Sequence, residues 1–328
     1  LHPRFELTQR ERVLQELYPT VKQLLLVAKE HNIMVSLDAE EATRLDMQLE
    51  LFTLLAEDDD LKDYHGLGFV LQAYQKRALP VLNFLQHLVQ STNRRIPIRL
   101  VKGAYWDSEI KKAQIDGLPG YPVFTRKSHT DVSYLACAAK LLQHPDCFYP
   151  QFATHNALTV AAILEVAGES EFEFQRLFGM GESFYNSQLG KKPVRIYAPV
   201  GQYDELLPYL IRRILENGAN TSFINLVVDD KEPIGDLLRN PITRAEFTQG
   251  RARPDIPLPC DIYAHRKNSK GIDFGNKHQL NQLTEAVANS RYSTQPLSEI
   301  PHTTETQLKA IITQAKVASK PWSQRSFD

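Results

Sequence analysis

Short apolar runs alternate with longer stretches of apolar residues at helical spacing, from the N-terminus to about residue 217. The short runs predict β-strands at residues 33–37, 68–72, 98–101, 148–153, 172–177 and 194–198. The longer stretches predict helices at residues 13–28, 45–55, 82–88, 130–142, 157–166 and 203–217. Thr8 and Glu11 predict a capping box at the start of the first helix, and Pro19 predicts a kink within it.

Six strand–helix units in a row predict parallel strands joined by right-handed crossovers. Either an open doubly wound sheet or a closed (β/α)8 barrel could contain them. Polar residues lie in or just after all six strands: Asp38, Gln72, Arg99 with Lys102, His155 with Asn156, Gln175 and Tyr197. A barrel gives this distribution, because the loops after all its strands meet at one mouth. We therefore predict an α/β fold of the TIM-like barrel type, lacking its first two strands.

The pattern changes after about residue 227. Five prolines lie between residues 233 and 259, which is typical of a connecting segment. Helical spacing returns at residues 277–288 and again after a Thr304-x-x-Gln307 capping box. We predict a barrel at residues 1–226, a linker at 227–260, and the start of another domain at 261–328.

Composition narrows the class of protein. The formal net charge is -1 over 328 residues, so no global field attracts nucleic acid or anionic lipid. No apolar run is long enough to span a bilayer, and no signal peptide is recognisable, which predicts a cytoplasmic protein. Cys137, Cys147 and Cys260 have no metal-binding spacing, so we expect reduced thiols. The first residue is not Met, which suggests a piece of a longer chain.

Two cations interrupt the apolar strand near residue 100. Arg99 and Lys102 need an anion or a hydrogen-bonding ligand if they are buried, and Gly103, Tyr105 and Trp106 follow with space and flat aromatic surface. This stretch is either a solvated edge strand or a strand end that binds a large, planar, anionic ligand.

The helix at 203–217 carries Tyr209, Arg212, Arg213 and Glu216 on one face. Two neighbouring guanidinium groups can clamp a carboxylate, although this helix alone favours a solvated face with an Arg–Glu pair. His155 with Asn156, and Thr125 to Lys127, are either surface or structural groups, or phosphate ligands at a barrel mouth. Residues 172–177 fit an ordinary buried strand with Glu173 and Arg176 at its margin.

Seven long stretches match one known family in order: residues 99–111, 121–127, 130–135, 152–156, 172–177, 195–201 and 209–223. They closely resemble the proline dehydrogenases, and more narrowly the proline dehydrogenase domain of bacterial bifunctional proline utilization A proteins. The resemblance covers residues 1 to about 226. Residues from about 260 resemble the entry to the aldehyde dehydrogenase module of those proteins.

The resemblance implies an FAD-dependent enzyme on a distorted (β/α)8 barrel. It would oxidise L-proline to Δ1-pyrroline-5-carboxylate, the first step of proline catabolism to glutamate, and pass electrons to membrane quinone. The parent would also act as an L-glutamate γ-semialdehyde dehydrogenase whose NAD site lies outside this chain. A cytoplasmic homo-oligomer bound peripherally to the inner face of the bacterial membrane is implied, with no nucleic-acid partner for this segment.

The resemblance also implies roles for individual residues. Arg212 and Arg213 would bind the proline carboxylate, and Tyr105, Leu177 and Tyr197 would shape the proline pocket. Arg99, near the flavin N5, would be catalytic together with Tyr197 and Asp38. The implied FAD-binding residues are Asp38, Gln72, Arg99, Val101, Lys102, Gly103, Ala104, Trp106, Thr125, Arg126, Lys127, Thr130, His155, Asn156, Glu216, Ser222 and Phe223. The family's first two strands, with a lysine that helps to bind the carboxylate, would precede Leu1.

Two other functions are compatible with the residues. A chain that lacks two barrel strands could be a non-catalytic fragment of the same bifunctional protein. A phosphate-binding barrel acting on a sugar phosphate would need a Gly-rich loop after its last strands, and Gly201 alone is a poor match.

Overall fold

The computed structural model describes residues 2–182, 185, 192–218, 240–290 and 302–325, with the backbone only at 214–218. The chain divides into two compact units, residues 1–282 and 283–328. The side chain of Glu216 and all of Ser222 and Phe223 lie outside the described residues, so their predicted roles remain predictions.

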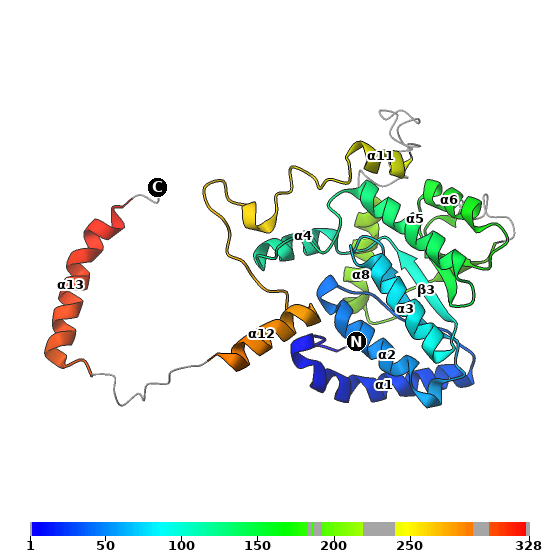
Figure 1. Cartoon of the computed structure of the whole chain (residues 1–328), viewed down its shortest axis with the longest axis horizontal. Coiled ribbons are helices and arrows are strands. Elements are labelled where there is room, and N and C mark those ends of the chain that lie inside the picture. The colour runs from blue at the N-terminus through cyan, green and yellow to red at the C-terminus, as the bar shows by residue number, and fades with distance from the viewer. Residues whose placement is uncertain (1, 183–184, 186–191, 219–239, 291–301, 326–328) are drawn as a thin grey trace. The chain divides into compact units, whose positions relative to one another are not determined.

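The first unit contains one sheet of six parallel strands, each paired with the next along the chain (Figure 1). This order confirms the predicted α/β fold of parallel strands. The strands are β1 (Val35–Leu37), β2 (Leu67–Gln72), β3 (Ile96–Val101), β4 (Phe148–Ala153), β5 (Glu173–Leu177) and β6 (Val194–Tyr197).

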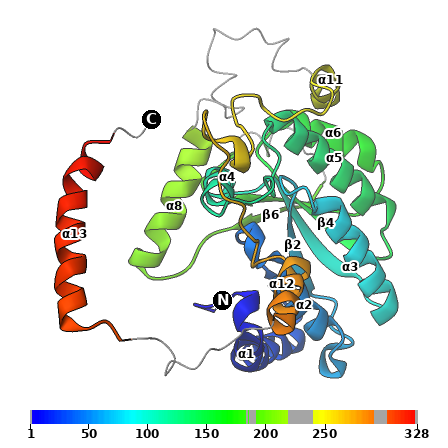
Figure 2. The ribbon, with the colours of Figure 1, turned by 60° about the vertical axis from the view of Figure 1, so that its left-hand side comes forward.

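Helices follow the strands and pack on one another in chain order: α1 on α2, α2 on α3, α3 on α5, and α5 on α6. Figure 2 shows α8 on the other side of the strands from α3 and α5. The helices are α1 (Arg10–Glu30), α2 (Leu45–Ala56), α3 (Ala78–Thr92), α4 (Trp106–Ile115), α5 (Lys127–Gln143), α6 (Ala157–Ala167), α8 (Tyr203–Gly218), α11 (Pro241–Phe247), α12 (Lys277–Asn289) and α13 (Glu305–Ser323). Short 3-10 helices lie at η1 (Leu7–Gln9), η2 (Ala42–Arg44), η3 (Asp59–Leu61) and η4 (Pro259–Asp261).

Side chains alternate between the two faces of the sheet, because successive residues of a strand point to opposite sides. Phe69 of β2, Ile98 of β3, Phe152 of β4 and Phe174 of β5 belong to the main apolar core, which also contains the inner faces of the helices. Burial of each such side chain contributes about 1.5–3 kcal/mol. The opposite face carries polar side chains at Arg99, Gln151, Glu173, Gln175 and Arg195.

The two predicted capping boxes have different outcomes. Thr304 and Gln307 form the predicted box at the start of α13, with side chain and backbone bonded reciprocally. The box at Thr8 is wrong, because η1 precedes α1 and the Thr8 hydroxyl donates to the Glu6 carboxylate at 3.3 Å. α1 then continues through Pro19 as one helix.

Residues 240–277, here called the return segment, run back along the first unit. The Pro257 carbonyl accepts a hydrogen bond from Tyr121 at 2.6 Å, and the Gly271 amide donates to the Gly117 carbonyl at 2.8 Å. At its end, the Lys277 amide donates to the Asp46 carboxylate of α2 at 2.9 Å. The described part of the predicted linker, residues 240–260, therefore contacts the first unit at Pro257, and the residues after it contact that unit at Gly271 and Lys277.

Cys137, Cys147 and Cys260 are free thiols, as predicted. Among the described residues, no helix has the length and apolar character to cross a bilayer. The same part of the chain contains no cluster of side chains suited to hold a metal ion.

Candidate active site

Arg99 lies at the centre of the polar face of the sheet. Its Nε donates to Oε1 of Gln175 on β5 at 2.8 Å, and its Nη1 lies 3.5 Å from Oδ1 of Asp38, just after β1. β1 and β5 are each two strands from β3, about 10 Å in a flat sheet. One side chain reaches both, so the sheet curls around this face. Arg99 is therefore held by protein groups inside a concave surface, which rules out the solvated edge strand.

The stretch after β3 turns away from the sheet on groups of the protein itself. The Lys102 ammonium forms an ion pair with Asp131 of α5, both side chains being one-quarter exposed. A Cβ on Gly103, whose φ is +134°, would lie 2.4 Å from the ring of Tyr74. The close approach predicted at Gly103 is thus made by a tyrosine. Trp106 begins α4, and its indole N–H donates to the Phe124 carbonyl at 2.8 Å.

Gln72, at the end of β2, fixes two backbone segments of the mouth. Its amide nitrogen donates to the Glu40 carbonyl at 2.7 Å, and its oxygen accepts from the Ala104 amide at 3.4 Å. Gln72 therefore supports the surrounding loops. Val101 is half-buried and Ala104 exposed beside it.

α8 brings Arg212 and Arg213 to the same mouth. Burial raises the pKa of the Tyr105 phenol, and the Arg212 charge opposes that shift in pKa. Burial and neighbouring Tyr209 raise the pKa of the Tyr197 phenol, while Arg213 and Arg99 oppose the rise. Both phenols are therefore protonated at neutral pH, with guanidinium groups close enough to affect their pKa values. The helical face predicted as a possible carboxylate clamp does lie beside Tyr105 and Tyr197.

His155 and Asn156 follow β4 at the same edge. Burial, together with Arg176 and Arg213, lowers the pKa of His155, so the imidazole is neutral at pH 7. Its Nε2 is buried and has no hydrogen-bond partner among the described residues. The Asn156 side-chain oxygen instead accepts from the Thr159 amide at 2.9 Å and caps α6. Leu177 ends β5 and is 3% exposed.

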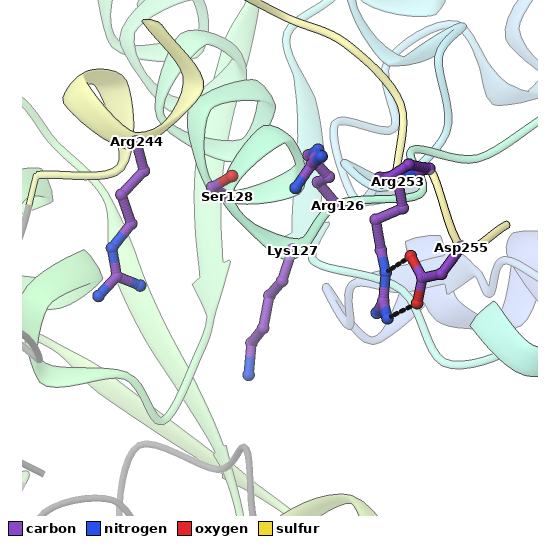
Figure 3. Close-up of a pocket in the computed structure, with 7 residues that line it drawn as sticks. Arg126, Lys127, Ser128, Arg244, Arg253 and Asp255 are labelled. Carbon is purple, nitrogen blue, oxygen red and sulfur yellow. Dashed lines mark hydrogen bonds and ion pairs between the residues drawn. The ribbon is translucent and has the colours of Figure 1, made fainter. Parts of the chain in front are cut away.

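A pocket of about 530 Å³ lies at the start of α5. It is lined by four cations and one carboxylate, together with smaller groups: Arg126, Lys127, Ser128, Arg244, Arg253, Pro254 and Asp255. Figure 3 shows the side chains of Lys127, Arg244 and Arg253 extending in the same direction. The excess of positive charge beside a helix N-terminus suits an anion.

The return segment forms one wall of this pocket. Arg126 donates to the Arg251 carbonyl at 2.8 Å, and the Thr125 hydroxyl accepts from the Arg253 amide at 3.0 Å. Arg253 is in turn paired with Asp255. Thr130, one turn into α5, is buried. Sequence reasoning predicted Thr125 to Lys127 but missed Arg244 and Arg253, because these side chains come from the part interpreted as a linker.

Sequence reasoning also missed a buried carboxylate. Glu173 is 3% exposed and accepts hydrogen bonds from Arg195, Gln175 and Gln151 at 2.7, 2.7 and 2.9 Å. The predicted buried strand is confirmed, with Glu173 as its first residue, but the hydrogen bonds of this carboxylate were not predicted. The signal was available in the alternation of Glu173, Gln175 and Leu177 against Phe172 and Phe174.

Known proteins match this chain in sequence over most of its length. Residues 3–226 match the family model for proline dehydrogenase. The bifunctional protein PutA of Escherichia coli K12 is 50% identical over 92% of this chain and 24% of its own length. Proline dehydrogenase 2 of Bacillus subtilis strain 168 is 31% identical over 63% of this chain and 61% of its own.

Solved structures give the same result. A crystal structure of a bifunctional PutA protein aligns with a TM-score of 0.88 at 47% identity, covering 99% of this chain and 33% of that one. The PutA of Bdellovibrio bacteriovorus inactivated by N-propargylglycine aligns with a TM-score of 0.76 at 30% identity, covering 88% of this chain and 30% of that one. The chain spans about a quarter of the length of the PutA relatives that it matches. It belongs to the proline dehydrogenase family.

Proposed function

We propose that this chain is the proline-oxidising part of a bifunctional enzyme. It would oxidise L-proline to Δ1-pyrroline-5-carboxylate with FAD, the first step of proline catabolism to glutamate. The observation that carries the proposal is the meeting of Arg212 and Arg213 with Tyr105, Tyr197 and Arg99 at one concave mouth. Two guanidinium groups with neutral phenols suit a small substrate that carries one carboxylate.

The residues also fit FAD. A flat isoalloxazine would lie over the polar face near Arg99, and an anionic diphosphate would suit the excess of cations at the start of α5. The buried His155 Nε2, without a partner among the described residues, is positioned to bond a polar atom of such a ligand. We assign Lys102, Gly103 and Trp106 to the walls that support it.

Each protein group then has a defined task. Arg212 and Arg213 would bind the carboxylate and orient proline with its C5–H bond toward the position proposed for the flavin, near Arg99. Tyr105 and Tyr197, kept protonated by burial, donate hydrogen bonds without adding negative charge beside the carboxylate. FAD, when bound, supplies the two-electron acceptor. Arg99 stabilises negative charge at that position, and Asp38 holds one end of its guanidinium group.

An absorbance experiment tests the proposal. The purified 328-residue chain is mixed with FAD and separated from free flavin, and spectra are recorded before and after L-proline. We expect a yellow protein that L-proline bleaches and D-proline leaves yellow. N-propargylglycine, named with the Bdellovibrio relative, should abolish bleaching irreversibly. A folded chain that retains no flavin would contradict the proposal and support the non-catalytic fragment.

The proposal extends to the longer protein. Residues 261–328 would begin an aldehyde dehydrogenase domain whose NAD site lies beyond this chain. Electrons would pass to membrane quinone through peripheral association of a cytoplasmic homo-oligomer. The match of 99% of this chain to PutA structures three times its length supports a continuous polypeptide.

A further inference from the structure

Three side chains on the polar face form a linear relay. Glu173 Oε1 accepts from Gln175 Nε2 at 2.7 Å, and Gln175 Oε1 accepts from Arg99 Nε at 2.8 Å. Gln175 is 2% exposed, so water has little access to either bond. The amide thus joins a buried carboxylate to the guanidinium group that we place beside the flavin.

The two neighbours determine which way the Gln175 amide points. A carboxylate can only accept hydrogen bonds and a guanidinium group can only donate them. A flipped amide would direct its oxygen at Glu173 and its NH2 at Arg99, with both contacts repulsive. Amide orientation, which is normally an assignment, is therefore fixed here by chemistry.

Glu173 is itself held in place and ionised. Arg195 donates two hydrogen bonds to its two oxygens, at 2.7 and 2.8 Å, and Tyr149 donates one at 3.3 Å. Burial alone would raise the pKa of Glu173, but the bonds from Arg195 and Gln175 outweigh burial and keep that pKa below its usual value. The negative charge that orients Gln175 is thus present at neutral pH.

We propose that Glu173 is a positioning residue that acts through Gln175 to fix the Arg99 guanidinium toward Asp38 at the mouth of the sheet. The consequence for flavin binding and reduction rests on the function proposed above. Glu173 touches neither substrate nor cofactor in this scheme. Its task is to keep Gln175 presenting an acceptor, because a free amide would let Arg99 turn away from the ligand.

The first test needs no flavin. Hydrogen exchange at Arg99 Nε–H is followed by NMR on the full chain, with the resonance assigned by Arg99→Lys. We expect Gln175→Leu to accelerate exchange about ten-fold or more, since the hydrogen bond from the charged Arg99 Nε–H loses its acceptor. Glu173→Gln should also accelerate exchange, because it removes the carboxylate charge that fixes the orientation of the Gln175 amide. Tyr149→Phe removes another bond to the same carboxylate and should leave exchange unchanged. Unaltered exchange in folded Glu173→Gln overturns the relay.

The second test uses the flavin-loaded chain and measures the FAD dissociation constant and the flavin reduction potential. Each single variant should weaken FAD about ten-fold and lower the potential. If Glu173 acts through Gln175, the double variant should be no worse than Gln175→Leu alone. Additive losses in the double variant would show that Glu173 has a separate structural role and would contradict the proposal.

Two provisions keep the tests decisive. Glu173→Gln leaves Arg195 without its carboxylate partner, so a variant that fails to fold is replaced by Glu173→Gln with Arg195→Leu, which removes both charges. If the wild-type chain binds no FAD, the proposed function fails, while the exchange measurement still tests the relay.

Discussion

Replacing Arg213 with methionine should weaken proline binding far more than the same change at Arg212. Arg213 is half-buried, and its guanidinium carbon lies 5.7 Å from the centre of the Tyr209 ring, whereas Arg212 is exposed. A hydrogen bond to a charged group contributes about 1.5–3 kcal/mol, and about 1.4 kcal/mol corresponds to ten-fold in affinity. The lower end applies to Arg212 because water screens its charge. We therefore expect losses of about ten-fold for Arg212→Met and about 100-fold for Arg213→Met.

The assay is the proline concentration that gives half-maximal flavin bleaching in a single turnover. Arg213→Lys should fall between wild type and Arg213→Met, because lysine keeps the charge but loses the planar fork. Arg12→Met on α1 removes an exposed arginine paired with Glu16 and serves as the charge-matched control. Half-saturation of Arg213→Met within two-fold of wild type, with FAD bound normally, would refute the clamp.

Three further predictions concern groups around the mouth. The pKa of His155 is lowered in the folded chain, so the unfolded chain binds a proton at a higher pH than the folded chain does. The free energy of unfolding should therefore decrease as pH falls below about 6.5. His155→Gln should make that decrease smaller, measured by urea titration at pH 5 to 7. Burial raises the pKa of Glu109, whose carboxylate accepts a hydrogen bond from the Ala42 amide at 2.6 Å. Ionisation of this buried side chain therefore destabilises the folded chain as pH rises. Glu109→Gln should raise the melting temperature more at pH 8 than at pH 5. Arg126→Ala removes bonds to the Arg251 and Ala252 carbonyls, so trypsin should cleave after Arg251 faster than in wild type, with cleavage after Arg12 as the internal reference.

The strands were predictable because their core face is strongly apolar. Phe148–Ala153 has the bounds that the apolar run predicts, and the other five strands differ by one or two residues at an end. Gln72, Arg99 and Tyr197 were found because parallel strands place their carboxyl ends at one edge. Periodicity therefore predicted the parallel strands, and the polar residues at the strand ends predicted the position of the mouth.

Features that depend on contacts across the chain were not predictable from local patterns. Glu173 stands two residues from Gln175, but its bonds to Arg195 and Gln151 require the register of three strands. Thr8 and Glu11 have the spacing of a capping box, but Thr8 lies within the 3-10 helix η1 and its hydroxyl donates to the Glu6 carboxylate. Arg244 and Arg253 lie in a proline-rich stretch that looks like a linker in isolation.

The return segment has a consequence for the order in which this protein assembles. Its contacts join residues that are far apart in sequence, such as Arg126 with Arg251 and Asp46 with Lys277, the latter separated by 231 positions. Such contacts raise the contact order and form only after loop-closure entropy has been overcome. Lys277 must leave the ribosome before its amide can bind Asp46 of α2. The pocket at α5 therefore cannot be complete until residues 244–255 have left the ribosome, after all six strands have been synthesised.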